Sequence, residues 1–434
     1  MEKNIGKTVL TAVMAAVTAS CGTATKTANG NETATTVTKT EQPATKTAQS
    51  AAATAQSAKP TITVAEQLGM VRLNNTFALN LFNSIDATGS TVVSPLSVTC
   101  LMSILANGAD GQTRSEILKT IGWEGKTTDD INAVCRMIMD KAAQSDPSTV
   151  VNMANYVAVN KGYTPREEFA STVRDCYKAD VESLDFASKD AVKHINAWCN
   201  RQTEGMIPQI VQEMEANAVA YLMNAIYFNG TWTEKFDKKN TKEERFQGYT
   251  RDIKRVKMMH QEEEFMYMDN GTYSAVKLPY GNRSYNMTVL LPNEGKSIAE
   301  MMGTFDAKGL TGIGKSMDKC IVDLKLPRFS TEMELPLNDI IGKLGAPSMF
   351  KPGAADFRNF ASGNIFISKM LQKAKIEVSE EGTKAAAVTA AMMVGASLVQ
   401  HEPRRVEFHA NRPFVYMITD ENGAILFLGQ YTGD

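Results

Sequence analysis

The sequence predicts an α+β fold, with most helices in the first half of the chain and most strands in the second. Residues 65–85 and 191–202 carry apolar side chains at helical spacing, and 98–105 is an apolar run that follows Ser94-Pro95. Strands are predicted for the apolar or alternating runs at 219–228, 286–291, 321–329, 365–378, 414–418 and 425–428. Because helices and strands do not alternate along the chain, a parallel α/β fold is disfavoured.

Length and charge exclude several classes of function. The chain has 434 residues, enough for one large domain or two ordinary ones with a sizeable core. Its 46 basic and 48 acidic residues leave a formal charge of -2, so no nucleic-acid partner is expected. The four histidines disfavour a multi-histidine metal site, and G-x-S-x-G, H-E-x-x-H and P-loop motifs are absent. The sequence therefore predicts neither a metal nor another cofactor, and no catalytic residues.

The first 20 residues have the character of an export signal. Lys3 and Lys7 precede an apolar run at 9–17, and small residues at 18–20 precede Cys21. This arrangement resembles a bacterial lipobox, although Thr18 stands where leucine is usual. The resemblance implies that Cys21 is lipidated and anchors an outer-membrane or cell-surface lipoprotein. A periplasmic position, or an ordinary secretory signal with an incidental cysteine, is the alternative.

Residues 21–63 are predicted to be the lipidated cysteine followed by a disordered tether, and the folded domain is predicted at 64–434. Residues 22–60 are rich in alanine and threonine, with one valine and no leucine, isoleucine or phenylalanine, so they cannot bury enough apolar surface to fold. The folded part contains an odd number of cysteines, which are Cys100, Cys135, Cys176, Cys199 and Cys320. We expect buried thiols rather than a disulfide framework.

Residues 380–400 are a stretch of small side chains between two predicted strands. Alanine alone would allow a helix here. At a period of two, one face carries only small side chains, which are Thr383, Ala385, Ala387, Thr389 and Ala391. Lys384 falls on the opposite face. The segment is therefore suited to insertion between two strands without steric conflict.

From about residue 65 to its end, the chain resembles the serpin family. The resemblance rests on six segments in the family's order: 94–97, 108–113, 195–198, 222–232, 380–387 (Glu-Glu-Gly-Thr-x-Ala-Ala-Ala) and 411–414 (Asn-Arg-Pro-Phe). It implies helices packed around a large central β-sheet with two further sheets. It also implies an exposed reactive-centre loop at about 380–407.

The resemblance implies a suicide-type inhibitor of serine proteases, with cysteine proteases as the alternative class, that is a monomer in its native state. The target attacks the loop and forms an acyl-enzyme, and the cleaved loop then inserts as a new strand and deforms the protease. The inhibitor itself needs no catalytic residues. The alternative is a non-inhibitory serpin that acts as a binding or chaperone protein at the cell envelope. Such a serpin would usually carry bulky, charged or proline residues on the inserting face.

The resemblance also assigns roles to individual residues. The hinge of the loop would be Glu380, Gly382, Thr383, Ala385 and Ala387, with Thr383 the first inward residue to insert. The breach and shutter, where the central sheet opens, would be Arg328, Trp232, Ser94, Ser97, Asn224 and Gln372. Glu380 is expected to pair with Arg328, and Gln372 stands where the family usually has a histidine.

The family's spacing implies cleavage between Ala396 and Ser397, because Ala396 is the seventeenth residue counted from Glu380. A small residue before the cleaved bond suits elastase-like serine proteases. Alternative sites for chymotrypsin-like or subtilisin-like enzymes are Met393, Val394 and Leu398. Arg404 and Arg405 would be open to trypsin-like enzymes. Cutting there should give simple proteolysis, because the tether would be slack.

Overall fold

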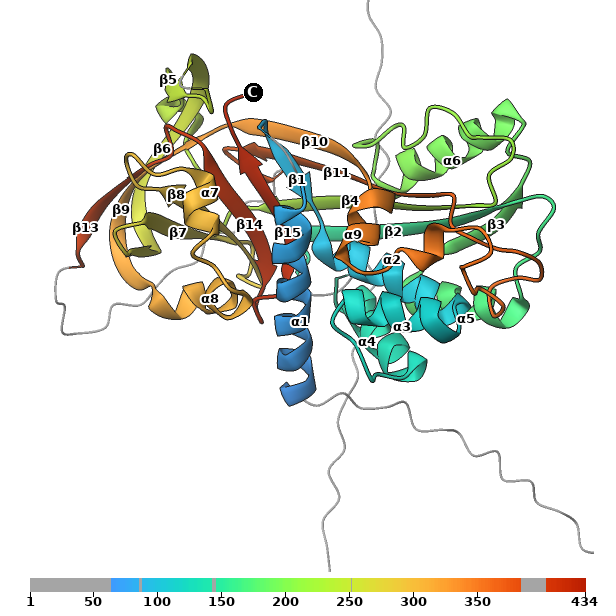
Figure 1. Ribbon diagram of the computed structural model, residues 1–434. Coiled ribbons are helices and arrows are strands. Elements are labelled where there is room, and N and C mark those ends of the chain that lie inside the picture. Colours follow the sequence, from blue (N-terminus) through green and yellow to red (C-terminus); the bar gives the residue numbers. More distant parts are fainter. Residues whose placement is uncertain (1–63, 86–87, 143–145, 251, 384–402) are drawn as a thin grey trace, which may run out of the picture. The chain divides into compact units, whose positions relative to one another are not determined.

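The computed structural model describes residues 64–85, 88–142, 146–250, 252–383 and 403–434 (Figure 1). Several predicted features lie outside these residues: the signal and tether, Cys21, the loop positions Ala385, Ala387, Met393, Val394 and Leu398, and the Ala396-Ser397 bond.

The helices of the described residues are α1 (Val64–Asn83), α2 (Pro95–Gly108), α3 (Gly111–Thr120), α4 (Thr128–Ala142), α5 (Glu167–Tyr177), α6 (Lys189–Gln202), α7 (Ile298–Met302), α8 (Ala307–Gly312) and α9 (Asn338–Leu344). The strands are β1 (Thr91–Val93), β2 (Thr149–Asn160), β3 (Asp180–Leu184), β4 (Ala220–Thr231), β5 (Lys242–Gln247), β6 (Ile253–Asp269), β7 (Tyr273–Tyr280), β8 (Tyr285–Pro292), β9 (Asp318–Pro327), β10 (Phe329–Pro336), β11 (Lys369–Ser379), β12 (Gly382–Thr383), β13 (Arg405–His409), β14 (Phe414–Asp420) and β15 (Ile425–Tyr431). None of the helices in this part of the chain is long and apolar enough to cross a membrane.

The strands form two hydrogen-bonded sheets. We call the six-stranded sheet, in the order β10-β11-β12-β4-β2-β3, the central sheet. The other sheet has the order β1-β15-β14-β8-β7-β6-β9-β13, with β5 paired to β6. The sequence predicted two further sheets beside the central one. In the structure they are continuous, because the 17-residue strand β6 pairs with β5, β9 and β7 along its length.

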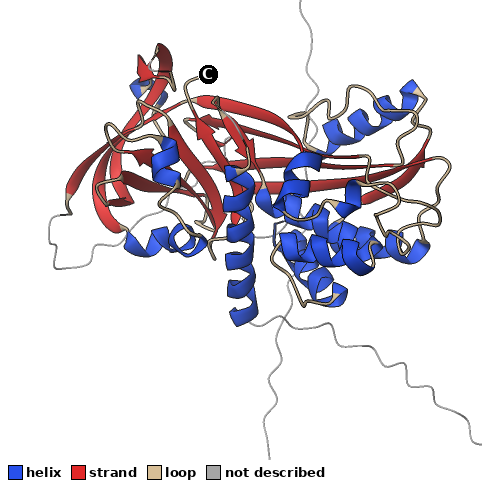
Figure 2. Cartoon of the chain, viewed as in Figure 1, coloured by secondary structure: helices blue, strands red, loops and turns tan. Residues whose placement is uncertain are grey.

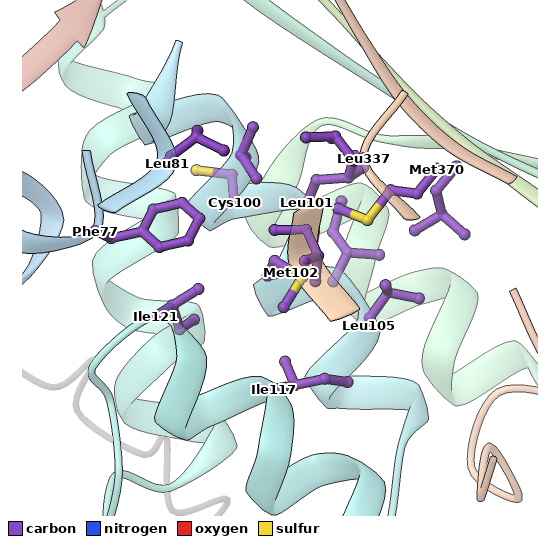
Figure 3. Packing of buried hydrophobic residues seen from close by; sticks show 14 of the residues in the cluster. Phe77, Leu81, Cys100, Leu101, Met102, Leu105, Ile117, Ile121, Leu337 and Met370 are labelled. Atoms are coloured by element: carbon purple, nitrogen blue, oxygen red, sulfur yellow. The ribbon is translucent and has the colours of Figure 1, made fainter. Parts of the chain in front are cut away.

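Both faces of the central sheet are covered by helices (Figure 2). On one face, Val157 and Leu222 pack with α1, α2 and α3 in the largest apolar cluster, part of which is seen in Figure 3. On the opposite face, Tyr156 and Tyr221 pack with Trp198 of α6. Because neighbouring strand residues point to opposite faces, β2 and β4 need apolar residues at nearly every position.

The α+β prediction is confirmed, with corrections to individual elements. The predicted helices correspond to α1, α6 and the middle of α2. The predicted strand at 321–329 is wrong as a single unit, because β9 ends at Pro327 and β10 begins at Phe329 in a different sheet. The strand predicted at 365–378 begins only at Lys369, and Ile365 and Ile367 before it are buried outside any strand. The prediction of buried thiols is confirmed, since all five described cysteines are free and buried.

Candidate functional site

Two long strands of the central sheet, β11 and β4, contact each other over only part of their lengths. Residues 369–374 of β11 pair in parallel with residues 221–226 of β4, and we call this pairing the seam. Beyond the seam, β12 lies between the two strands and runs antiparallel to both. The central sheet is therefore closed along the seam and already separated where β12 sits.

A two-residue turn reverses the chain between β11 and β12. Glu380 and Glu381 form this turn, directly after Ser379. Gly382 follows with a φ of +145°, and a Cβ atom there would lie 2.1 Å from the carbonyl oxygen of Gly230. Only glycine tolerates both that backbone conformation and that approach. The Glu-Glu-Gly sequence thus directs the chain back into the sheet.

Thr383 already lies inside the central sheet. It is fully buried, and its Oγ1 is 2.7 Å from the phenol oxygen of Tyr280. The ring of Tyr280 stacks on Trp232 at 4.3 Å between centroids, and the indole Nε1 of Trp232 donates to the carbonyl oxygen of Ser379 at 2.9 Å. The sequence predicted Thr383 as the first residue to insert. In the structure Thr383 already pairs with Val378 of β11 and Gly230 of β4.

Glu380 and Arg328 form the predicted ion pair, but the pair is not an exposed one. Two guanidinium nitrogens of Arg328 donate to the carboxylate of Glu380, at 3.1 Å from Nε and 2.6 Å from Nη2. The Oγ1 of Thr241 donates to the same carboxylate at 2.8 Å. The side chain of Glu380 is 1% exposed and that of Arg328 is 41% exposed. Breaking the pair would leave a buried carboxylate without its strongest donor.

Burial alone would raise the pKa of the Glu380 carboxyl. The hydrogen bonds from Arg328 and Thr241 outweigh burial, so its pKa lies below the usual 4.5. Glu381 is also held ionised, because hydrogen bonds from Lys235 and Lys238 lower the pKa of its carboxyl. Both acidic residues of the turn are therefore charged at neutral pH, and Glu380 alone is buried.

The predicted shutter residues meet at the seam, beside the start of α2. The Oγ of Ser94 caps this helix by accepting from the backbone nitrogen of Ser97. The amide of Gln372 accepts from the Ser94 nitrogen at 2.8 Å, and donates to the Ser94 oxygen and to Oδ1 of Asn224, each at 3.0 Å. Asn224 in turn donates to Oδ1 of Asn155 at 3.0 Å. Uncharged side chains thus connect α2, β11, β4 and β2 across the seam.

Sequence reasoning missed three residues of this site, which are Asn155, Thr241 and Tyr280. Asn155 lies opposite Asn224 in the β2–β4 register and is fully buried. The available signal was an amide within the apolar run 150–159, which also carries Asn152. Thr241 and Tyr280 lie about 100 or more residues before Glu380 and Thr383, and no local pattern marks them as partners.

The chain downstream of the loop returns to the nine-stranded sheet earlier than predicted. β13 begins at Arg405, so the last residues of the predicted 380–407 loop lie in a strand. Arg405 pairs with Ile321 in register and forms an ion pair with Glu262. The carbonyl oxygen of Arg404 accepts from the Ile321 nitrogen at 2.9 Å. Both arginines are therefore held by β9, which should slow cutting by trypsin-like enzymes.

Reversing the charge of Glu380 should open the central sheet. In Glu380→Lys an ammonium faces Arg328 in a buried position, so we expect the hinge to leave the sheet and polymers to form faster on mild heating. The rate of polymer formation is measured on native gels. Glu381→Lys is the matched control, since its partly exposed ion pairs contribute little stability. Equal rates for Glu380→Lys and the parent would contradict the assigned role.

Acid should have the same effect as this substitution. Because the folded pKa of Glu380 is depressed, its ion pair stabilises the hinge above about pH 4.5, and this contribution is lost as the pH falls through the folded pKa. We expect polymerisation at fixed mild heat to accelerate below pH 4.5. Glu380→Gln should polymerise quickly at neutral pH and change less with acid. A parent and variant with the same pH profile would exclude Glu380 as the titrating group.

Comparisons with known proteins agree with this geometry. A family model described as "Serpin (serine protease inhibitor)" matches residues 72–433. The leukocyte elastase inhibitor of Homo sapiens is 32% identical over 376 residues, which cover 83% of this chain and 98% of that protein. Serpin B6 of Macaca fascicularis is 30% identical over 375 residues, covering 84% of this chain and 99% of that protein.

A solved structure shows the same fold. The native state of the thermophilic serpin tengpin matches with a TM-score of 0.77 and 27% identity, covering 86% of this chain and 96% of that chain. Sequence similarity over most of the chain and similarity of fold thus lead to one conclusion. The chain belongs to the serpin family.

Proposed function

We propose that this serpin is a suicide-type protease inhibitor that traps its target as a covalent acyl-enzyme. The observation that carries the proposal is the position of β12 between β11 and β4. The first part of the loop is already a strand of the central sheet, and the seam lies directly in line with it. A cleaved loop could therefore continue along the same path by parting the seam.

The proposed reaction begins at the Ala396-Ser397 bond. The nucleophilic oxygen of a serine protease attacks the carbonyl carbon of Ala396, and its proton passes to the protease's own general base. The C–N bond breaks, the new amine of Ser397 takes that proton, and Ala396 remains joined to the protease as an ester. All the catalytic groups belong to the protease. The inhibitor contributes a substrate and a place for the cleaved chain to go.

Insertion competes with hydrolysis of the ester. An inserted strand would run antiparallel to both β11 and β4 and would replace one parallel pairing by two antiparallel ones. The gain in hydrogen bonds and buried surface favours insertion once cleavage has freed the loop. A protease attached to the moving strand would be pulled along the sheet and distorted before water can release it.

We assign elastase-like serine proteases as the target class. A shallow specificity pocket accepts the small side chain of Ala396 and rejects larger ones. The human relative named above carries leukocyte elastase inhibitor as its name, which supports the same class. Strand pairing of the segment around Arg405 in turn disfavours trypsin-like targets.

Incubation with an elastase-like serine protease should give a complex that survives denaturant. The C-terminal fragment released during trapping is then identified by intact-mass analysis. We expect it to begin at Ser397. A fragment beginning at Val394, Gly395 or Val399 would assign cleavage after Met393, Val394 or Leu398 instead. If proteases of a panel cleave the loop and none of them forms a stable complex, a non-inhibitory binding or chaperone role is favoured.

Thr383→Arg should convert the inhibitor into a substrate. Thr383 is fully buried against Tyr280, so an arginine there must leave the sheet or be buried without a partner. Loop insertion should slow while cleavage continues, and the stoichiometry of inhibition should rise several-fold. Thr383→Ser keeps the hydroxyl and is the control, which should trap protease like the parent. A stoichiometry near one for Thr383→Arg would contradict the proposal.

We propose separately that Cys21 carries a lipid that attaches the protein to a membrane. The support is its position directly after the small residues 18–20, followed by the alanine- and threonine-rich segment. Cys21→Ala should move the protein from the membrane fraction to the soluble fraction of cells that express it. The inhibitory activity of the soluble form should be unchanged. A variant that stays with the membrane as firmly as the parent would rule out this anchor.

A further inference from the structure

A cavity of about 590 Å³ lies between α1, α4 and the turn that joins β14 to β15. None of the hinge, breach or shutter residues that the structure describes lines it. Its volume falls in the usual range for small-molecule sites. Much of the wall is apolar and includes Met70, Val71, Leu96, Met137, Ile138 and Leu426.

Three buried polar side chains line the same cavity. Asn74, Thr99 and Trp123 are 4%, 1% and 2% exposed, and each has one polar atom without a hydrogen-bond partner in the described parts of the chain. These atoms are Oδ1 of Asn74, Oγ1 of Thr99 and Nε1 of Trp123. Buried polar atoms are nearly always paired, so three unpaired ones in residues of one cavity wall mark it as a place where a polar group could gain partners. The three atoms are almost fully covered in the empty cavity, so a ligand reaches them only when the covering side chains move.

The donor or acceptor character of these three atoms defines which groups of a ligand could form hydrogen bonds with them. The amide nitrogen of Asn74 donates to the carbonyl oxygen of Ile425 at 3.1 Å, which leaves Oδ1 as an acceptor in need of a donor. The indole nitrogen of Trp123 is only a donor and needs an acceptor. The hydroxyl of Thr99 can serve in either role. A group that both donates and accepts, such as a primary amide or a hydroxyl, could pair with any one of them.

The charged residues that line the cavity disfavour an anion. They are the carboxylates of Asp140, Asp420 and Glu421 and the ammonium group of Lys141. Lys141 is bound by Asp420 at 3.0 Å and by Glu421 at 2.9 Å. Because its charge is matched by these two carboxylates, it offers little attraction to a further anion. Asp140 also pairs with Lys178 at 3.8 Å, which leaves the group of charges net negative by one and suits a neutral or cationic molecule.

We propose that this cavity binds a small amphipathic molecule with an apolar body, a polar end that both donates and accepts hydrogen bonds, and no negative charge. The apolar body would lie against the methionine, leucine and isoleucine side chains. Its polar end would pair with the atoms of Asn74, Thr99 and Trp123. The site is separate from the seam, so this proposal does not depend on protease inhibition.

The proposal is tested with four naphthalene derivatives that differ only in their polar group. The probes are 2-naphthamide, 2-naphthylmethanol, 2-naphthylmethylamine and 2-naphthoate, each titrated against the full chain by calorimetry or ligand-observed NMR. We expect the first three to bind, and 2-naphthoate to bind at least about tenfold more weakly because of the carboxylates. Equal or tighter binding of 2-naphthoate would overturn the charge argument. Absence of binding by every probe would show that the cavity holds only water.

Substitutions in the wall then locate the binding site. Thr99→Val removes the hydroxyl at nearly constant size, so it should weaken binding of 2-naphthamide about threefold to tenfold while raising the unfolding temperature of the free protein. Met137→Trp, or Ile138→Phe if the first variant does not fold, should fill the cavity and abolish binding. Thr331→Val changes a buried threonine of β10 outside the cavity and is the matched control. Weakening by Thr331→Val, or unchanged binding in the wall variants, would refute the proposal.

Discussion

The parallel seam between β11 and β4 is the contact on which the rest of the structure depends. While it is closed, the central sheet is a single surface with apolar clusters on both faces. Parallel pairing is slightly less stable per residue than antiparallel pairing, and an antiparallel strand fits between the two. The native fold therefore leaves a more favourable pairing unmade. The native fold persists because β11 and β4 must separate before that pairing can form, and their separation costs free energy.

That cost has two parts. The strands cannot separate without losing the hydrogen bonds of the seam and the side-chain bond from Gln372 to Asn224. Packing is the second part of the cost. Side chains of β4 are buried under helices on both faces of the sheet, Leu222 on one face and Tyr221 on the other. Close-packed interiors resist small separations. The seam can therefore open most readily from the end where it is already parted, and β12 occupies that end.

The sequence predicted the helices with clear periodicity, and the family resemblance picked out residues that the structure brings together around β12 and the seam. Pattern alone failed where one apolar run serves two sheets, as at Pro327, because hydrophobicity does not record which sheet a strand joins. Pattern also does not record burial: the charges of Glu380 and Arg328 suggested a pair, and only the packing around the turn reveals that the carboxylate is buried. Tyr280 and Asn155 were missed because their partners are distant in sequence.

The seam and the turn before β12 respond differently to acid. At the shutter, Gln372 and Asn224 are neutral at every physiological pH, so protonation does not alter their hydrogen bonds across the seam. A histidine at residue 372 would be titratable, with a pKa that burial lowers from its usual value near 6.5, and its protonation would introduce a buried charge there. At the breach, Glu380 depends on ionisation to hold Arg328 and Thr241. Glutamine at the shutter thus confines this pH response to the turn before β12, where loosening frees the hinge without weakening the seam itself.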